Sequence, residues 1–176
     1  PGLKGPDLYA YISAGIQSDH ECTTEQEARE KLMAGMYIMV RQGTCAKNLQ
    51  ALLPAVNEKT ARRMMWCSDD RHPHDLIAEG HIDSMVYEAI QSGLDPILAI
   101  QMATLNPAEY FKLDHLGAIA PGKQADLVIF SDLKRPVIEK VYCRGILTAE
   151  NGKISPDIAV PPATSVAPSI TSPMPS

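Results

Sequence analysis

The sequence predicts an α/β protein with a parallel sheet, and three observations carry this prediction. The first seventy residues alternate three times between helix-like and strand-like segments, and each helix is long enough to cross over between parallel strands. Residues 36–41 are almost wholly apolar, which is typical of a strand buried on both faces of such a sheet. From Gly117 the pattern changes to turns and strands, which indicates a small β element as a second packing unit.

The first part of the chain is expected to run helix, strand, helix, strand, helix, strand. Leu8 and Ile12 share one face of the first helix, which Gly15 ends in the manner of a C-cap. Thr24 is expected to cap the second helix, because Glu27 follows at the spacing of a capping box. The predicted helices are residues 7–14, 24–34 and 48–56, and the predicted strands are residues 16–20, 36–41 and 64–68.

Two further helices and three further strands are expected in the rest of the chain. The pair Asn106-Pro107 should interrupt the second of these helices, and Asn151-Gly152 indicates a tight hairpin turn. The predicted helices are residues 81–92 and 96–111, and the predicted strands lie within residues 117–130, 137–143 and 146–148.

Three strand–helix units cannot close a barrel by themselves, because an eight-stranded barrel needs about 250 residues. The parallel part is therefore either a small open sheet or the last part of a barrel that begins elsewhere. Both ends of the chain look cut. It starts at Pro1-Gly2 without a methionine, and its last residues are rich in proline and serine, as in a tail or linker.

The composition argues against several classes of protein. A net charge of -5 and a pI near 5.5 argue against a nucleic-acid partner. No apolar run approaches the roughly 18 residues of a membrane helix, and no signal-peptide pattern opens the chain. The four cysteines never form a C-x-x-C pair, which excludes a zinc ribbon and disfavours a disulfide scaffold. We therefore expect a cytoplasmic protein that binds neither nucleic acid nor membrane.

In residues 64–73 an apolar strand ends at two carboxylates, an arginine, a histidine and a proline. The carboxyl-terminal tips of parallel strands are where ligands and catalytic groups collect. An aspartate at such a tip can bind a metal or accept a proton from water. The alternative is a polar loop whose aspartate caps the next helix, and the pattern alone leaves both open. Pro73 is expected to keep this segment a loop, so His72 and His74 should not form a strand-like metal pair.

Several runs of residues resemble the adenine deaminases of the metal-dependent amidohydrolase superfamily, in register over most of residues 3–155. The runs S-D-H-E-C-T and D-D-R-H-P are specific to the adenine deaminases, whereas the N-P and A-D-L pieces mark only the superfamily. The matching segments are residues 14–23, 46–49, 68–73, 80–83 and 102–108, and residues 117–128 resemble a superfamily-wide signature.

The resemblance implies the last strand–helix units of a (β/α)8 TIM-like metallo-hydrolase barrel plus part of a small β-sandwich. It places His20 on the sixth strand, residues 36–41 on the seventh and Asp69 on the eighth. The superfamily's ligands on the first, fourth and fifth strands have no counterpart here, so the chain alone is expected to lack a competent metal site. The implied division is residues 1–116 for the barrel part, 117–155 for the sandwich strands and 156–176 for the tail or linker.

The resemblance also implies the roles of two residues. Asp69 would bind the metal, accept the proton of the metal-bound water as it attacks C6 of adenine, and pass it to the departing ammonia. His20 is implied as a metal ligand and catalytic residue, against the alternative of a hydrogen-bonded structural histidine. A ligating imidazole needs a partner for its other nitrogen, and the sequence leaves Asp19 and Glu21 open for this.

The candidate site is completed by four residues near these two. They are candidate substrate-binding groups: Glu21, Asp70, Arg71 and His72. A salt-bridged loop explains Asp70 and Arg71 equally well. Cys22 lacks an evident base partner and is expected to be a small buried residue.

The function that the resemblance implies is hydrolytic deamination of adenine to hypoxanthine and ammonia by a metal-activated hydroxide. Histidine and carboxylate donors suit manganese, iron or zinc, and the resemblance points to manganese or iron. The expected partners are a purine base and the upstream half of the same barrel, and the open strand edges favour a homo-oligomer. Two alternatives stay open: a cyclic-amide hydrolase of the dihydroorotase or hydantoinase type, and a non-catalytic half-barrel that serves as a structural or interaction fragment.

Overall fold

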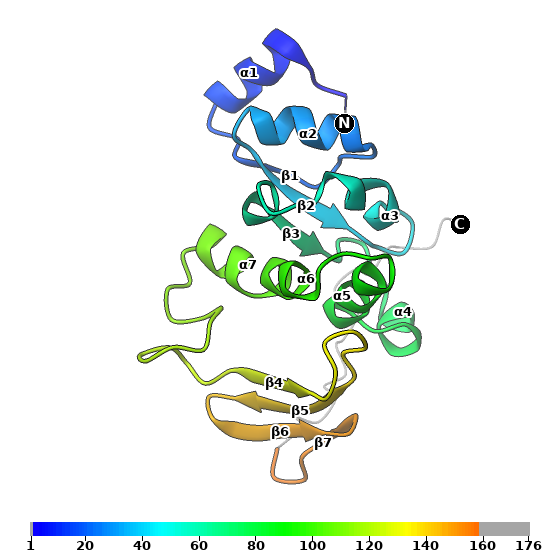
Figure 1. Ribbon diagram of the computed structural model, residues 1–176, viewed down its shortest axis with the longest axis vertical. Coiled ribbons are helices and arrows are strands. Elements are labelled where there is room, and N and C mark those ends of the chain that lie inside the picture. The colour runs from blue at the N-terminus through cyan, green and yellow to red at the C-terminus, as the bar shows by residue number, and fades with distance from the viewer. Residues whose placement is uncertain (1, 159–176) are drawn as a thin grey trace, which may run out of the picture.

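A computed structural model describes residues 2–158, so residues 159–176 of the predicted tail lie outside the described residues. The described chain forms two parts that follow one another (Figure 1). The first is a three-stranded parallel sheet with helices, and the second is a four-stranded antiparallel sheet. The prediction of a mixed α/β chain is confirmed.

The helices and strands of the first part alternate as the sequence pattern predicts, with small shifts at their ends. A single helix was expected over residues 48–56, whereas a short α-helix runs there into a 3₁₀ turn. The elements are α1 (Gly5–Ser13), β1 (Ser18–Asp19), α2 (Glu25–Met33), β2 (Tyr37–Arg41), α3 (Leu49–Leu52), the 3₁₀ turns η1 (Leu53–Ala55) and η2 (Ala61–Arg63), β3 (Met64–Cys67), α4 (Pro73–Ala78), α5 (Ile82–Gln91), α6 (Pro96–Ala103) and α7 (Leu105–Tyr110).

Strand β2 is the central strand of the parallel sheet. Its partners are β1, where Ser18 pairs with Tyr37, and β3, where Ile38 pairs with Met64. Since all three strands run in the same direction, their carboxyl ends meet at one edge of the sheet. This edge carries the polar residues that the sequence analysis singled out.

One face of the sheet packs against the helices. Ile38 and Val40 of β2 and Trp66 of β3 are buried in one apolar cluster with residues of α2, α3, α5 and α6. The indole nitrogen of Trp66 donates to the carbonyl oxygen of Ala99 at 2.9 Å, which satisfies its polar atom inside the core. Because side chains alternate along a strand, Arg41 points to the face opposite Ile38 and Val40.

Thr24 caps α2, as the capping-box spacing predicts. Its Oγ1 accepts a hydrogen bond from the backbone nitrogen of Glu27 at 3.3 Å. The carboxylate of Glu27 accepts from the backbone nitrogens of Gly2 and Thr23, at 2.7 and 3.3 Å. Glu27 therefore ties the segment before α1 to the start of α2.

The prediction that Pro73 keeps its segment a loop is wrong. Pro73 is the first residue of α4, and His72 precedes it as the N-cap residue with extended backbone angles. Proline suits this position, because its fixed φ fits a helix and the first turn leaves its backbone nitrogens without helical partners.

The last predicted helix is interrupted as expected, but two residues earlier than Asn106-Pro107. The backbone of Thr104 (φ −128°, ψ −78°) separates α6 from α7. Pro107 lies in the first turn of α7, where its missing N–H breaks no helical bond. Asn106 is buried and donates from Nδ2 to the carbonyl oxygens of Ala61 and Met64, at 2.7 and 2.8 Å.

The strands predicted after Gly117 form the antiparallel sheet, in the order β4 (Leu127–Phe130), β5 (Ile138–Cys143), β6 (Ile146–Glu150) and β7 (Lys153–Ile154). Asn151 (φ 48°) and Gly152 (φ 76°) make the predicted tight turn, in the left-handed conformation that a two-residue hairpin of type I′ requires.

No helix within residues 2–158 has both the length and the apolar content to cross a membrane.

Candidate active site

The candidate site lies at the edge of the parallel sheet where the three strands end. His20 and Glu21 follow β1, Arg41 is the last residue of β2, and Asp69 lies two residues after β3. Asp69 adopts a left-handed backbone conformation (φ 47°), which aspartate tolerates better than most residues. The sheet therefore brings an imidazole, a guanidinium and two carboxylates to one edge.

Arg41 connects the ends of all three strands. Its Nη1 donates to Oε1 of Glu21 and to Oδ2 of Asp69, both at 3.0 Å. Its Nε donates to Oδ1 of Asn48 at 3.3 Å. Burial lowers the pKa of Arg41, but the hydrogen bonds to the two carboxylates outweigh burial and raise this pKa above its ordinary value. The guanidinium is therefore a permanent positive charge between two acids.

His20 lies beside Glu21 on the exposed side of this cluster. Its Nε2 is 3.5 Å from Oε1 of Glu21, and both side chains are nearly half exposed. Asp19 bonds elsewhere, because its Oδ1 accepts from the backbone nitrogen of Glu21 and its Oδ2 accepts from Lys31. Of the two acids that the sequence leaves open as partners of His20, the structure brings Glu21 to the imidazole.

A buried group of three charges connects β1 to α2. Nζ of Lys31 donates to Oδ2 of Asp19 at 2.5 Å and to Oε1 of Glu27 at 2.7 Å, and the Lys31 side chain is 2% exposed. Burial lowers the pKa of Lys31, but these two bonds outweigh burial and raise it. Asp19 is thus held between Lys31 and the backbone of Glu21, which fixes the main chain next to His20.

Cys22 lies next to this charged group. Burial, followed by the charge of Asp19, raises the pKa of the Cys22 thiol to about 12, so the thiol stays protonated at neutral pH. Within residues 2–158, the one group of three ligating side chains whose ligand atoms all lie within 4.8 Å of one another is Asp19, Cys22 and Glu27. The ammonium of Lys31 already bonds both carboxylates, so this group does not suit a metal cation.

His20, Glu21 and Asp69 offer the donors that a divalent cation of the manganese, iron or zinc type takes. Arg41 uses one oxygen of each carboxylate, and within the described residues Oδ1 of Asp69 and Oε2 of Glu21 accept no hydrogen bond. The Asp69 and Glu21 side chains are 33% and 43% exposed. The three side chains therefore offer suitable donors at one edge of the sheet, but their ligand atoms do not all lie within 4.8 Å of one another, so within residues 2–158 they do not form a closed metal site.

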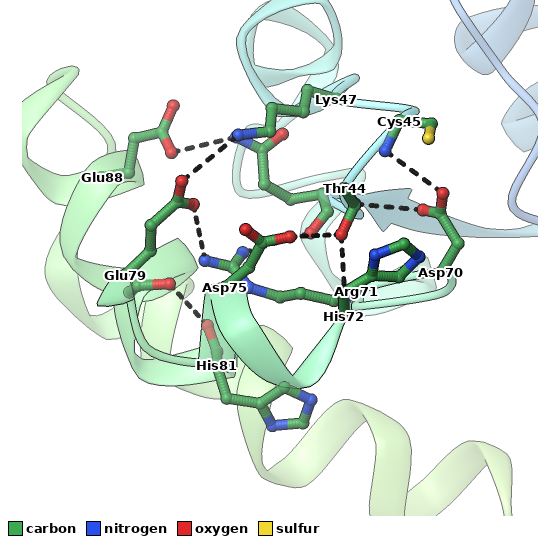
Figure 2. A network of polar contacts seen from close by, with 12 residues as sticks. Thr44, Cys45, Lys47, Asp70, Arg71, His72, Asp75, Glu79, His81 and Glu88 are labelled. Atoms are coloured by element: carbon green, nitrogen blue, oxygen red, sulfur yellow. Dashed lines mark hydrogen bonds and ion pairs between the residues drawn. The ribbon is translucent and has the colours of Figure 1, made fainter. Parts of the chain in front are cut away.

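Asp70 holds the loop that follows β2, as Figure 2 shows. Its two carboxylate oxygens accept from the backbone nitrogens of Thr44 and Cys45, both at 3.1 Å. These bonds, chiefly the one from Cys45, lower the pKa of Asp70. A Cβ at position 43 would collide with Oδ1 of Asp70, so Gly43 permits this close approach.

Arg71 and His72 extend the same network (Figure 2). The Arg71 side chain is almost fully buried, and it donates to the carbonyl oxygen of Gln42 at 3.2 Å and to Oε2 of Glu79 at 2.9 Å. The backbone nitrogen of His72 donates to Oγ1 of Thr44 at 2.9 Å. These contacts fit the salt-bridged loop that the sequence analysis kept as an alternative for Asp70 and Arg71.

Arg41 and Lys31 are the residues of this region that the sequence analysis missed. A signal for Arg41 exists, since a charged residue that ends an apolar strand must find a partner near the strand tips. Lys31 lies four residues after Glu27, a helical spacing that favours an ion pair. Nothing in the sequence shows that Asp19 lies close enough to Lys31 to join this ion pair.

A parallel sheet with acidic and imidazole groups at its carboxyl edge defines an α/β protein of the class that binds ligands at strand ends. A solved amidohydrolase has a similar fold, with a TM-score of 0.58 and 19% identity over 84% of this chain and 43% of that chain. The model of the Amidohydrolase family matches residues 3–153. The chain therefore belongs to the Amidohydrolase family, whose members generally use a divalent metal.

Two relatives within this family are much closer in sequence. The chain is 55% identical over 162 residues to an adenine deaminase of Desulfatibacillum aliphaticivorans. This match covers 92% of this chain and 28% of the relative. It is 51% identical over 158 residues to an adenine deaminase of Kosmotoga olearia. This match covers 90% of this chain and 27% of the relative. The chain thus spans little more than a quarter of the length of these relatives.

Proposed function

We propose that the chain is part of an adenine deaminase, a hydrolase that converts adenine and water to hypoxanthine and ammonia. The observation that carries this proposal is the 55% identity to an adenine deaminase across 92% of the chain. The geometry supports it, because His20 and Glu21 follow β1 and Asp69 follows β3 at the same edge of the parallel sheet, where Arg41 of the central strand bonds both acids. The free oxygens of the two acids suit both cation binding and proton transfer.

In this proposal His20 and Asp69 hold the divalent cation. When bound, the cation makes a water molecule acidic enough to act as a nucleophile near neutral pH. Asp69 accepts a proton from the attacking water and delivers it to the amine that leaves C6 of the purine. A carboxylate suits this task because it alternates between base and acid. We assign the transfer to Oδ1, the oxygen that Arg41 leaves free.

The substrate-binding proposal is narrower than the sequence analysis suggested. We keep Glu21 and the imidazole of His72 as candidates to contact the purine. We assign Asp70 and Arg71 to holding the loop after β2, because their charged groups bond to that loop and to Glu79. Manganese or iron is the proposed metal, with zinc as the alternative.

We propose that the free edges of β1 and β3 pair with the remaining strands of a (β/α)8 barrel, supplied by an upstream half of the protein. Within the described residues, each of these strands pairs on one side only. The upstream strands would supply the metal ligands that this chain lacks. Residues 1–116 would then complete the barrel, residues 117–155 would join a β-sandwich, and residues 156–176 would be a tail or linker. A cytoplasmic homo-oligomer is part of the same proposal.

The experiment combines this chain with the preceding part of the Desulfatibacillum aliphaticivorans adenine deaminase. Bound metal and ammonia release from adenine are measured, with dihydroorotate and hydantoin as alternative substrates. We expect the combination to bind metal and release ammonia from adenine, and each part alone to do so poorly. Ring opening without ammonia from adenine would favour a cyclic-amide hydrolase. Intact metal sites without either activity would favour a non-catalytic fragment.

A further inference from the structure

The three strand ends of the candidate site are connected by one side chain. Glu21 follows β1, Asp69 follows β3, and Nη1 of Arg41 lies 3.0 Å from an oxygen of each. Within residues 2–158, Arg41 alone bonds both carboxylates. It can do so because β2 is the central strand and Arg41 is its last residue.

The guanidinium is the buried member of this group. The Arg41 side chain is 9% exposed, against 43% for Glu21 and 33% for Asp69. Removing either acid would leave a buried charge short of partners, which is strongly unfavourable. Arg41 therefore holds each of the two more exposed acids through one oxygen, and the other oxygen of each accepts no hydrogen bond within the described residues.

Two further features restrict the geometry of this group. Asn48 accepts a hydrogen bond from Nε of Arg41 at 3.3 Å, which fixes the guanidinium from a third direction. Asp69 has a backbone conformation that non-glycine residues seldom adopt, and such conformations persist where surrounding contacts hold them. The bond from Arg41 to Oδ2 is such a contact.

Arg41 is unsuited to carry a proton itself, because a guanidinium does not lose its proton in proteins. Its effect on a reaction must therefore pass through the acids that it contacts. Two neighbouring carboxylates repel each other, and a positive charge between them offsets this repulsion. Arg41 supplies one positive charge for two negative ones and leaves the group with a net negative charge for a divalent cation.

We propose that Arg41 is a positioning residue of the site. It holds one oxygen of Asp69 and one oxygen of Glu21, so that the second oxygen of each acid faces the cation and the substrate. This inference rests on the proposed deaminase function. The role assigned to Arg41 is to orient both acids at once, which neither His20 nor Asp69 does.

The test uses the chain combined with the upstream part of the relative, as above, and compares Arg41→Met with Arg41→Lys. Arg62→Met is the matched control, because Arg62 pairs with Glu109 at the surface, with both side chains 49% exposed. For Arg41→Met we expect kcat for adenine and Mn²⁺ affinity to fall by about 10–100-fold, as for other partners of metal ligands. Arg41→Lys should recover part of both losses, and Arg62→Met should match the wild type.

Each outcome bears on the inference. Unchanged kcat and Mn²⁺ affinity in Arg41→Met would overturn it and leave the proposed function intact. Equal losses in Arg41→Met and Arg62→Met would also overturn it. If the wild type binds Mn²⁺ but releases no ammonia from adenine, the deaminase proposal fails, and the Mn²⁺ affinities of the variants still test Arg41. If the wild type binds none of Mn²⁺, Fe²⁺ and Zn²⁺, both fail. Should Arg41→Met not fold, Arg41→Gln and Arg41→Lys decide by the same measurements.

Discussion

Lys31 and Asp19 form a buried ion pair between α2 and β1, with Nζ 2.5 Å from Oδ2. The other oxygen of Asp19 accepts from the backbone nitrogen of Glu21, at 2.6 Å. Glu21 in turn contacts Arg41 through its side chain. The ion pair therefore links the helix layer to the edge of the sheet where the candidate site lies.

Removing the lysine should destabilise the chain strongly. Lys31→Met leaves the carboxylates of Asp19 and Glu27 partly buried without their cation, and we expect the free energy of unfolding to fall by about 3–5 kcal/mol. Urea unfolding of the chain measures this loss. Lys59→Met, at an exposed position, is the control and should change little. A loss below about 1 kcal/mol, the range of an exposed pair, would show that the group contributes no more than a surface ion pair.

Acid should weaken the fold through Glu27. Burial raises the pKa of Glu27, but the hydrogen bonds from Lys31, Gly2 and Thr23 outweigh burial and hold this pKa below its ordinary value of 4.5. The folded carboxylate then binds protons less readily than the unfolded one. Its stabilising contribution is complete above pH 4.5 and is lost as the pH falls through the folded-state pKa.

The free energy of unfolding, measured in urea from about pH 6 down to about pH 3, should fall less steeply in Glu27→Gln than in the wild type. Glu58→Gln, at an exposed position, should keep the slope of the wild type. An equal slope in Glu27→Gln and the wild type would contradict the assignment.

Gly43 should be intolerant of a side chain because of Asp70. A Cβ at position 43 would collide with Oδ1 of Asp70, which holds the backbone of Thr44 and Cys45. We expect Gly43→Ala to lower the free energy of unfolding by about 1–3 kcal/mol, as overpacking does.

A double-mutant cycle with Asp70→Ala checks the cause. The cost of Gly43→Ala should largely disappear when the carboxylate is absent, because the collision is then removed. The same cost in both backgrounds would mean that the backbone, rather than Asp70, excludes alanine at this position.

Local sequence patterns predict most of the elements of the fold. Alternating apolar segments indicate the parallel strands, the Thr24–Glu27 spacing indicates the start of α2, and Asn151-Gly152 indicates a hairpin turn. The prediction at Pro73 is wrong because proline breaks a helix in its interior but favours the first helical position. Only the neighbouring residues decide between these two effects.

The contacts within the candidate site are harder to predict from the sequence than the helices and strands are, because they join residues that are far apart in the chain. Arg41 bonds two acids, one 20 residues before it and the other 28 residues after it. Asp70 spans 25 residues to Cys45. Such pairings follow from the order of the strands in the sheet, which a single sequence does not contain. The motifs around His20 and Asp69 therefore indicated a site, whereas its supporting residues emerged only from the fold.

The central claim is that Asp69 accepts and delivers the proton in the proposed deamination. The most direct measurement is kcat for adenine of Asp69→Asn in the chain combined with its upstream part, together with the bound metal. We predict a loss of at least about 100-fold, because an amide cannot serve as general base, while Asp114→Asn at an exposed position keeps normal turnover. Near-normal turnover in Asp69→Asn would contradict the account and move the proton transfer to another acid, with Asp70 the first to examine.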